Sequence, residues 1–308
     1  MEWKKLGLLY RPSENNRHPK LLTHAANPLP VKIEDDVFRV FYSGRDAQNR
    51  SSVGAVDIDI TQRRIVKQHH SPFFEYGAIG SFYADGVSIG NCYEVNGVHY
   101  MLFMGWQTPG DSHWRGDIGR LVVKSDLSLE LESLKPFLST DTIDPVSLSY
   151  PWVMADEQGS YHMWYGSTNT WDAGNDEMLH VINYASSSDG ENWNKRGVAV
   201  PYALNIAQAF SRPTVVGNIS DGYQMWFSYR SGTGEKYRIG YAVSDDGKKW
   251  QLDLGNTGID IGKEGWDSEM ICYPFVFDHK GQRYMLYNGD GYGRTGFGLA
   301  ILVNGTQC

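Results

Sequence analysis

The chain has 308 residues, of which 41% are hydrophobic and 21% are charged, a composition typical of a globular protein with a large core. Its formal net charge of −8, without any basic run, argues against a nucleic-acid partner. No apolar stretch approaches the roughly 18 residues of a membrane helix, and the N-terminus lacks a signal-peptide pattern. We therefore expect a cytoplasmic protein with no membrane partner.

Cysteine and histidine usage gives no indication of a cofactor. The three cysteines, Cys92, Cys272 and Cys308, are odd in number and far apart, so they predict neither a disulfide framework nor a zinc motif. The nine histidines show no paired spacing that would suit a metal. We expect reduced thiols, no bound metal and no cofactor.

The chain begins with a strand-like segment, Trp3–Tyr10, and then repeats one pattern five times. The second strand of each repeat is an apolar and aromatic run. Its matching aromatic residues are Tyr42, Phe103, Tyr165, Phe227 and Tyr287. They are spaced by 61, 62, 62 and 60 residues, a regularity that indicates a repeat architecture.

A residue–proline pair precedes the second strand in four of the repeats. The pairs are Asn27-Pro28, Tyr150-Pro151, Arg212-Pro213 and Tyr273-Pro274, and each proline lies 13 or 14 residues before its aromatic residue. Proline can begin a strand but disrupts its middle, so the pairs predict where each first strand begins. In the second repeat, Asp85-Gly86 is taken as the equivalent, at 17 residues.

Third and fourth strands follow in each repeat. In two repeats the third strand leads into an Asp-Gly turn, at Asp189-Gly190 and Asp246-Gly247, and then a tryptophan, Trp193 or Trp250, that we expect to pack on an outer strand. The fifth repeat ends without a fourth strand. Because Trp3–Tyr10 has the same pattern as the strand after Asp189-Gly190, we predict that it returns to complete the fifth repeat.

The sequence thus predicts an all-β fold, a five-bladed β-propeller with four-stranded blades whose N-terminal strand completes the last blade. All of 1–308 is expected to form one domain. The expected blades cover about 24–70, 81–135, 147–202, 209–261, and 268–304 together with 3–10. A two-domain chain or an open sandwich is the alternative.

A propeller would gather the first-strand entries at one end of its channel. These entries are Asn27, Asp85, Tyr150, Arg212 and Tyr273. Their chemistry differs although four share the same proline, as expected of a ligand site on a repetitive scaffold. Side chains that merely fill the channel are the alternative.

Other polar and aromatic residues lie near these entries or at strand ends, namely His24, Arg45, Asp46, Trp106, Asp267 and Glu269. His24 is also accounted for as a structural histidine, and Arg45-Asp46 as a surface ion pair. The glycine-rich segment 288–294 lacks the Lys-Ser/Thr ending of a phosphate loop, so we expect it to be a wide hairpin.

The repeated entries and the Asp-Gly-x-x-Trp turns resemble those of the five-bladed propeller glycosidase superfamily. That group includes invertases, levansucrases, arabinanases, β-xylosidases and, more distantly, mannoside phosphorylases. THAANP at 23–28 and YPFVF with YMLYNGDGYGRTGFGLA within 273–300 are most similar to uncharacterised glycosidase-like propellers encoded among bacterial surface-polysaccharide genes. This resemblance implies the fold over nearly the whole chain, whereas activity must be argued from the site.

The resemblance also implies a set of site residues. Hydrolases of this superfamily use an Asp at the blade-one entry, an Asp at blade two and a Glu near blade three, which meets the need for two carboxyl groups around the scissile bond. Asp85 matches the second of these, but Asn27 and Tyr150 depart from the pattern. The expected catalytic residues are therefore Asp85, Glu269 and Asp46. The expected substrate-binding residues are His24, Asn27, Arg45, Trp106, Tyr150, Arg212, Asp267 and Tyr273.

Several functions remain open at this point. The main expectation is a glycosidase-like enzyme acting on a glycan or an activated sugar. Alternatively, Arg212, Arg45 and His24 bind a phosphate or a sugar-nucleotide pyrophosphate, for phosphorolysis or glycosyl transfer. The third alternative is a noncatalytic propeller that binds a saccharide or another partner. The expected ligand is a saccharide or a sugar nucleotide, and the sequence leaves the oligomeric state undetermined.

Overall fold

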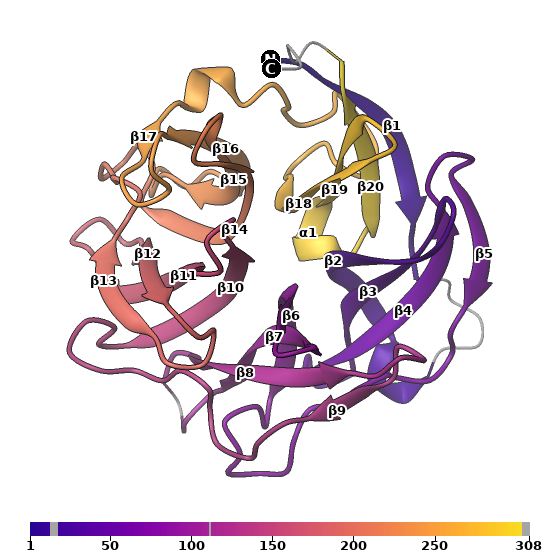
Figure 1. The fold of residues 1–308 in the computed structure, drawn as a ribbon, viewed down its shortest axis with the longest axis horizontal. Coiled ribbons are helices and arrows are strands. Elements are labelled where there is room, and N and C mark those ends of the chain that lie inside the picture. Colours follow the sequence, from indigo (N-terminus) through magenta and orange to yellow (C-terminus); the bar gives the residue numbers. More distant parts are fainter. Residues whose placement is uncertain (13–17, 111, 304–308) are drawn as a thin grey trace.

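The computed structural model describes residues 1–12, 18–110 and 112–303, and nearly all of their regular structure is β-strand. The strands form antiparallel sheets that radiate from a central axis (Figure 1), which confirms the predicted all-β propeller. The helical segments are η1 (Pro19–Leu21), η2 (Leu254–Asn256) and α1 (Asp290–Gly293). Within the described ranges, no helix has the length or the apolar character needed to cross a membrane.

Strand pairing divides the described strands into groups of four, which we call blades 1 to 5. Blades 1 and 2 contain β2 (Thr23–Glu34), β3 (Val37–Arg45), β4 (Ser51–Asp59) and β5 (Arg64–Gln68), then β6 (Gly86–Val95), β7 (Val98–Gln107), β8 (Arg115–Val123) and β9 (Leu129–Leu131). Blades 3 and 4 contain β10 (Ser147–Ala155), β11 (Tyr161–Thr170), β12 (Leu179–Ser187) and β13 (Asn194–Val198), then β14 (Ala209–Asn218), β15 (Gly222–Arg230), β16 (Arg238–Ser244) and β17 (Gln251–Leu252). Blade 5 contains β18 (Cys272–His279), β19 (Gln282–Asn288), β20 (Phe297–Leu302) and β1 (Trp3–Tyr10).

Blade 5 is closed by the N-terminal strand, as the sequence predicted. β1 pairs antiparallel with β20, with Trp3 opposite Leu302 and Tyr10 opposite Phe297. Trp3 is buried, and its ring meets Trp226 of blade 4 edge to face at 5.6 Å. The N-terminus is therefore bound to two blades, which joins the two ends of the ring.

The repeated aromatic residue of each second strand packs across a third strand. Tyr42, Phe103, Phe227 and Tyr287 lie opposite Gly54, Gly119, Gly240 and Gly298, and Tyr165 lies opposite Asn183. A Cβ atom placed on Gly240 would come within 2.5 Å of the Phe227 ring. At such positions the glycine leaves room for a ring that its neighbour supplies, an arrangement that favours one strand register.

Each first strand bends at a two-residue irregularity close to the axis. In blades 1, 3, 4 and 5 the irregularity contains the residue–proline pair. The residues before proline have positive φ, namely Asn27 (55°), Tyr150 (35°), Arg212 (49°) and Tyr273 (53°). This backbone region is unfavourable for non-glycine residues, so the surrounding structure must hold each bend in place.

Blade 2 differs from the expectation at this point. Its register shift lies between Ile89 and Cys92, so the bulged pair is Gly90-Asn91 and not Asp85-Gly86. Gly90 is needed because a Cβ atom there would lie 2.4 Å from the carbonyl oxygen of Pro151. The Asn91 amide replaces the missing proline in a different way, since it exchanges two hydrogen bonds with the backbone of Val153.

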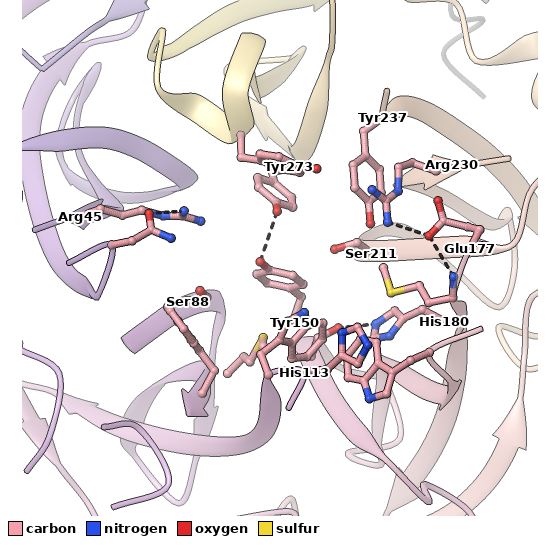
Figure 2. Close-up of a pocket in the computed structure, with 18 of the residues that line it drawn as sticks. Arg45, Ser88, His113, Tyr150, Glu177, His180, Ser211, Arg230, Tyr237 and Tyr273 are labelled. Carbon is pink, nitrogen blue, oxygen red and sulfur yellow. Dashed lines mark hydrogen bonds and ion pairs between the residues drawn. The ribbon is translucent and has the colours of Figure 1, made fainter. Parts of the chain in front are cut away.

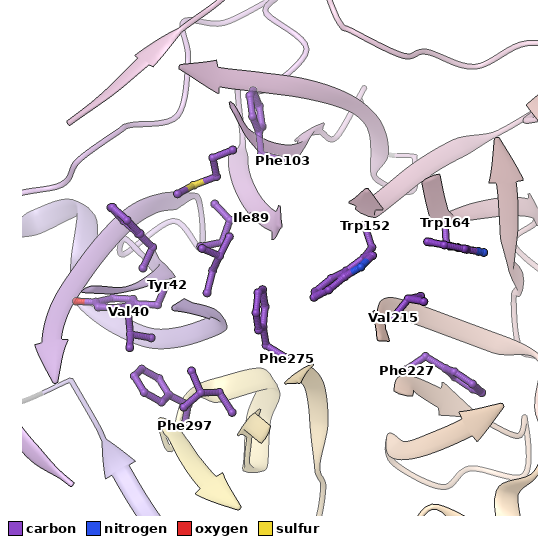
Figure 3. Packing of buried hydrophobic residues seen from close by; sticks show 14 of the residues in the cluster. Val40, Tyr42, Ile89, Phe103, Trp152, Trp164, Val215, Phe227, Phe275 and Phe297 are labelled. Atoms are coloured by element: carbon purple, nitrogen blue, oxygen red, sulfur yellow. The ribbon is translucent and has the colours of Figure 1, made fainter. Parts of the chain in front are cut away.

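Below these bends the axis is filled by large side chains (Figure 3). Trp152 and Phe275, each just after a proline, meet with ring centroids 4.9 Å apart. Arg212 is also buried there, with its guanidinium 5.9 Å from the Phe275 ring centroid. Its nitrogens donate to the carbonyl oxygens of Pro28 at 2.9 Å and Ile89 at 3.0 Å. One side chain of blade 4 thereby links blades 1 and 2 across the axis.

Ring closure predicts a large role for Trp3 in stability. Trp3→Ala should lower the free energy of unfolding by about 3–5 kcal/mol, because it removes a buried ring at the contact between blades 4 and 5. Urea denaturation followed by circular dichroism measures this change. Leu8→Ala is the matched control, because Leu8 lies on the same strand with 41% of its surface exposed. Equal losses in the two variants would contradict the role given to Trp3.

The aromatic–glycine pairing predicts that Gly240 cannot accept a methyl group. Gly240→Ala should lower the free energy of unfolding by about 1–3 kcal/mol, since the buried Phe227 ring would have to move. Gly255→Ala is the control, because no atom lies within 4 Å of the added Cβ position and its φ is not positive. Chemical denaturation of both variants tests this, and a Gly240→Ala protein as stable as the control would refute it.

Candidate functional site

A cavity of about 520 Å³ opens on the propeller axis, at the end where the second strands finish and the third strands begin. Its volume is within the range of small-molecule sites. All five blades contribute side chains to its wall (Figure 2). The aromatic members of the wall are Trp106, His113, Trp114, Tyr150, Trp171, His180, Tyr237, Tyr273 and Tyr292.

Two of the predicted entry residues present their side chains to this cavity. Tyr150 and Tyr273 face each other with their hydroxyl oxygens 3.4 Å apart and their ring centroids 5.3 Å apart. Burial raises the pKa of Tyr273 well above its usual value, so its hydroxyl remains protonated. These phenols can therefore donate hydrogen bonds to a ligand as well as contact it with their rings.

The other predicted entries are not among the residues that line the cavity. Asn27 is buried, and its backbone N–H donates to Asn288 Oδ1 at 2.9 Å. Arg212 is occupied by backbone carbonyls, as described above, and burial lowers its pKa to about 9, which leaves it charged at neutral pH. Both residues serve the bends and the packing on the axis.

A carboxylate that the sequence analysis missed lies on the wall at blade 3. Asp176 and Glu177 belong to the loop between β11 and β12, and both line the cavity. Glu177 Oε1 accepts from Arg230 Nη2 at 2.7 Å and from the backbone N–H of Met178 at 3.0 Å. The only sequence signal was an acidic pair in a long hairpin loop, which also describes many ordinary surface loops.

The loop that carries Glu177 is tied to blade 4. Asn175 Nδ2 donates to Gln208 Oε1 at 2.8 Å, and Gln208 Nε2 donates back to Asn175 Oδ1 at 3.1 Å. Arg230, at the end of β15, adds a second link and also packs 4.8 Å from the Tyr237 ring centroid. Glu177 is thus held by elements of two blades, which fixes the direction of its carboxylate.

An aromatic group forms the wall between blades 2 and 3. Trp171 stacks on His113, with centroids 4.7 Å apart, and meets Trp114 edge to face at 4.8 Å. Nearby, Trp106 donates its indole N–H to Ser51 Oγ at 3.1 Å. Flat apolar faces of this kind suit the C–H faces of a sugar ring, while the surrounding polar groups can bond its hydroxyls.

His180 forms a buried and neutral part of the wall. Its two ring nitrogens lie 2.7 Å from Ser149 Oγ and 2.6 Å from Thr168 Oγ1. Burial, with a smaller effect of Arg230, lowers the pKa of His180 to about 3. The imidazole is uncharged at neutral pH and is oriented by hydroxyls on both sides, so it does not add to the positive charge of Arg230.

None of the three carboxylates expected from the sequence is among the residues that line the cavity. Asp85 accepts a hydrogen bond from the backbone N–H of Thr108 at 2.6 Å. Burial alone would raise the pKa of Asp46, but hydrogen bonds from Arg50 outweigh it and lower that pKa, and the carboxylate closes a tight turn. Glu269 is exposed and pairs with Lys236, which lowers its pKa.

The remaining predicted residues lie partly inside and partly outside the cavity. Arg45 and Trp106 line it. Asp267 is buried away from it, where Oδ2 accepts from Lys5 Nζ at 2.8 Å and from the Tyr287 hydroxyl at 3.0 Å. His24 is half-buried, with Nδ1 at 2.8 Å from Thr23 Oγ1. No group of three potential metal ligands from His, Cys, Asp and Glu comes together in the described ranges.

Solved structures similar to this chain are mostly glycoside hydrolases. A structure titled "Glycoside hydrolase" matches 96% of this chain and 90% of its own length, with a TM-score of 0.70 and 17% identity. A thermostable family-43 glycoside hydrolase matches 95% and 94%, with a TM-score of 0.67 and 15% identity. A BT0996 complex with RGII in its name matches 98% and 92%, with a TM-score of 0.70 and 18% identity. At these identities the similarity establishes the fold.

Comparison of the sequence gives a closer relationship. No protein-family model matches the chain. Two Mycobacterium tuberculosis proteins, Uncharacterized protein MT1551 of strain CDC 1551 / Oshkosh and Uncharacterized protein Rv1502 of strain ATCC 25618 / H37Rv, are each 44% identical to it over 306 residues. The matches cover 99% of this chain and 100% of each relative. The chain therefore belongs to the same protein family as MT1551 and Rv1502.

Proposed function

We propose that the protein is a glycosidase-like enzyme that binds a saccharide in its central cavity and uses Glu177 as a catalytic carboxylate. The observation that carries this proposal is the composition of the cavity, in which a firmly held carboxylate faces a wall of tryptophan and tyrosine. The glycoside hydrolases that share the fold support the same class of ligand. The RGII complex among the structural neighbours adds to that support.

Saccharide binding depends on contacts from opposite sides of the cavity. Trp171, Trp106 and the Tyr150–Tyr273 pair would contact the sugar rings, while tyrosine hydroxyls and Ser211 would bond their hydroxyl groups. Arg230 would hold Glu177 in its ionised form. A carboxylate beside the anomeric carbon stabilises the positive charge that develops there when the glycosidic bond breaks.

Hydrolysis also needs a proton donor for the leaving group. Within the described part of the cavity wall, Asp176 is the other carboxylic acid, and it is exposed to solvent. We assign it this role, because the phenol of Tyr273 has a pKa too high for an efficient acid at neutral pH.

A noncatalytic saccharide-binding propeller is the second candidate. It is favoured by the position of Asp85, Asp46 and Glu269, each of which is engaged by other groups and is outside the set of residues lining the cavity. The described cavity wall thus lacks the carboxylate pair on separate blades that the resemblance implied. The two candidates differ in turnover and agree in ligand binding.

The aromatic wall predicts which residue sugar binding requires. In calorimetric titrations with a panel of neutral and acidic oligosaccharides, Trp171→Ala should weaken any measured affinity by about tenfold or more, because a stacking face is lost. Trp193→Ala is the control for losing an indole, since Trp193 packs at the outer strand of blade 3 and is not part of the cavity wall. Unaltered affinity in Trp171→Ala would place the sugar elsewhere.

Glu177 predicts how binding separates from turnover. With 4-nitrophenyl glycosides as substrates, Glu177→Gln should reduce kcat at least about a hundredfold, while affinity changes little, because the amide keeps the shape but loses the charge. Glu130→Gln is the matched control, since Glu130 pairs with Lys124 on a different surface. Full activity of Glu177→Gln would exclude the proposed role. Sugar binding without turnover in the unmodified protein would favour the noncatalytic candidate.

A further inference from the structure

One side of the cavity carries arginines that lack an acidic partner. Arg45, at the end of β3, lines the cavity opposite the pair formed by Glu177 and Arg230 (Figure 2). Its guanidinium donates to the neutral Asn49 Oδ1 at 2.7 Å, and no carboxylate forms an ion pair with it in the described ranges. Its charge therefore remains available to a ligand.

A second arginine lies on the same side, in the segment that links β19 and β20. Arg294 follows α1 and is exposed, and none of the described carboxylates forms an ion pair with it. Its side chain lies against Gly291, because a Cβ atom placed on Gly291 would be 3.1 Å from Arg294 Nε. Tyr292, from the same short segment, lines the cavity.

His24 lies between these two arginines. It forms a hydrogen bond with the backbone of Gly291, the residue that Arg294 covers. Burial, Arg45 and Arg294 together lower the pKa of His24 to about 4, which shows that both positive charges act on the imidazole. His24 is consequently a neutral side chain in a region of positive potential.

The charge of Arg212 increases this potential from behind the wall. Arg212 is fully buried, and its described partners are carbonyl oxygens, with no carboxylate among them. Its neighbour Ser211 lines the cavity. A charge in a poorly polarisable interior is weakly screened, so its field reaches the adjacent cavity.

We propose that the saccharide bound in the cavity is anionic, and that Arg45 and Arg294, with His24 between them, bind its carboxylate or phosphate group. This inference rests on the proposed function and specifies the chemical class of its ligand. Arginine is suited to such a group because its planar guanidinium can give two parallel hydrogen bonds to one oxyanion. The sugar ring would extend from this anion subsite toward Tyr150, Tyr273 and Glu177.

Calorimetry with matched charged and neutral probes tests the anion subsite. The probes are glucuronate, glucose 1-phosphate and UDP-glucose, with glucose as the neutral reference and inorganic phosphate as the anion alone. We expect at least one anionic sugar to bind ten times or more tightly than glucose, with an affinity that falls as salt is added. The tightest of the three identifies whether the anion is a carboxylate, a phosphate monoester or a sugar-nucleotide diphosphate.

The variant for this experiment is the double substitution Arg45→Gln with Arg294→Gln. It should weaken the anionic sugar at least tenfold and change glucose binding less than twofold, since both residues are accessible and replacement should leave the fold intact. Arg64→Gln is the control, because Arg64 is exposed on the outer strand β5. Circular dichroism of each variant verifies folding.

The outcomes separate this inference from the proposed function. Neutral and anionic sugars bound equally tightly, or an anionic sugar bound equally by the double variant, would overturn the anion subsite and leave saccharide binding intact. Phosphate binding that depends on Arg45 and Arg294, without binding of any sugar, would support the subsite and overturn the saccharide function. If none of the five probes binds, both are refuted.

Discussion

The bend in each first strand is the constraint on which the cavity depends. Without it, an inner strand would carry its alternating side chains straight past the axis. The bend instead turns Tyr150 and Tyr273 into the cavity and places Trp152 and Phe275 below them. The unfavourable backbone at these residues is retained because neighbouring blades hold it, as Arg212 does by bonding to the carbonyls of Pro28 and Ile89.

The same bends explain why a repetitive scaffold can hold an asymmetric site. Proline maintains the backbone geometry in four blades, so the preceding residue can vary in chemistry without loss of the bend. Two blades use that freedom for tyrosines that face the ligand, and blade 4 uses it for an arginine that links the inner strands. The carboxylate comes from elsewhere, a hairpin loop of blade 3, where Glu177 is fixed by Arg230 from blade 4.

Charge is divided across the cavity in a way that the whole-chain composition does not reveal. The protein has a net charge of −8, yet Arg45 and Arg294 lie on one side without carboxylate partners in the described ranges, and Glu177 lies on the other side. This arrangement suits a ligand with an anionic group at one end and a reacting centre at the other. It also makes the Glu177 ion pair a local exception within a positive environment, which favours its ionised form.

The sequence by itself determined the fold, because periodic aromatic residues, prolines and turn motifs each report on local backbone geometry. It even located β1, since the missing outer strand and the pattern of Trp3–Tyr10 are both local signals. It could not locate the blade-2 bend, where Gly90 replaces the proline signal because the carbonyl of Pro151 comes too close for a side chain. Only the tertiary structure decided which polar residues face the cavity. Asp46, Asp85 and Glu269 looked suitable as residue types, but a nearby partner engages each of them, and Glu177 reaches the wall through contacts with Arg230 that lie 53 positions away in sequence.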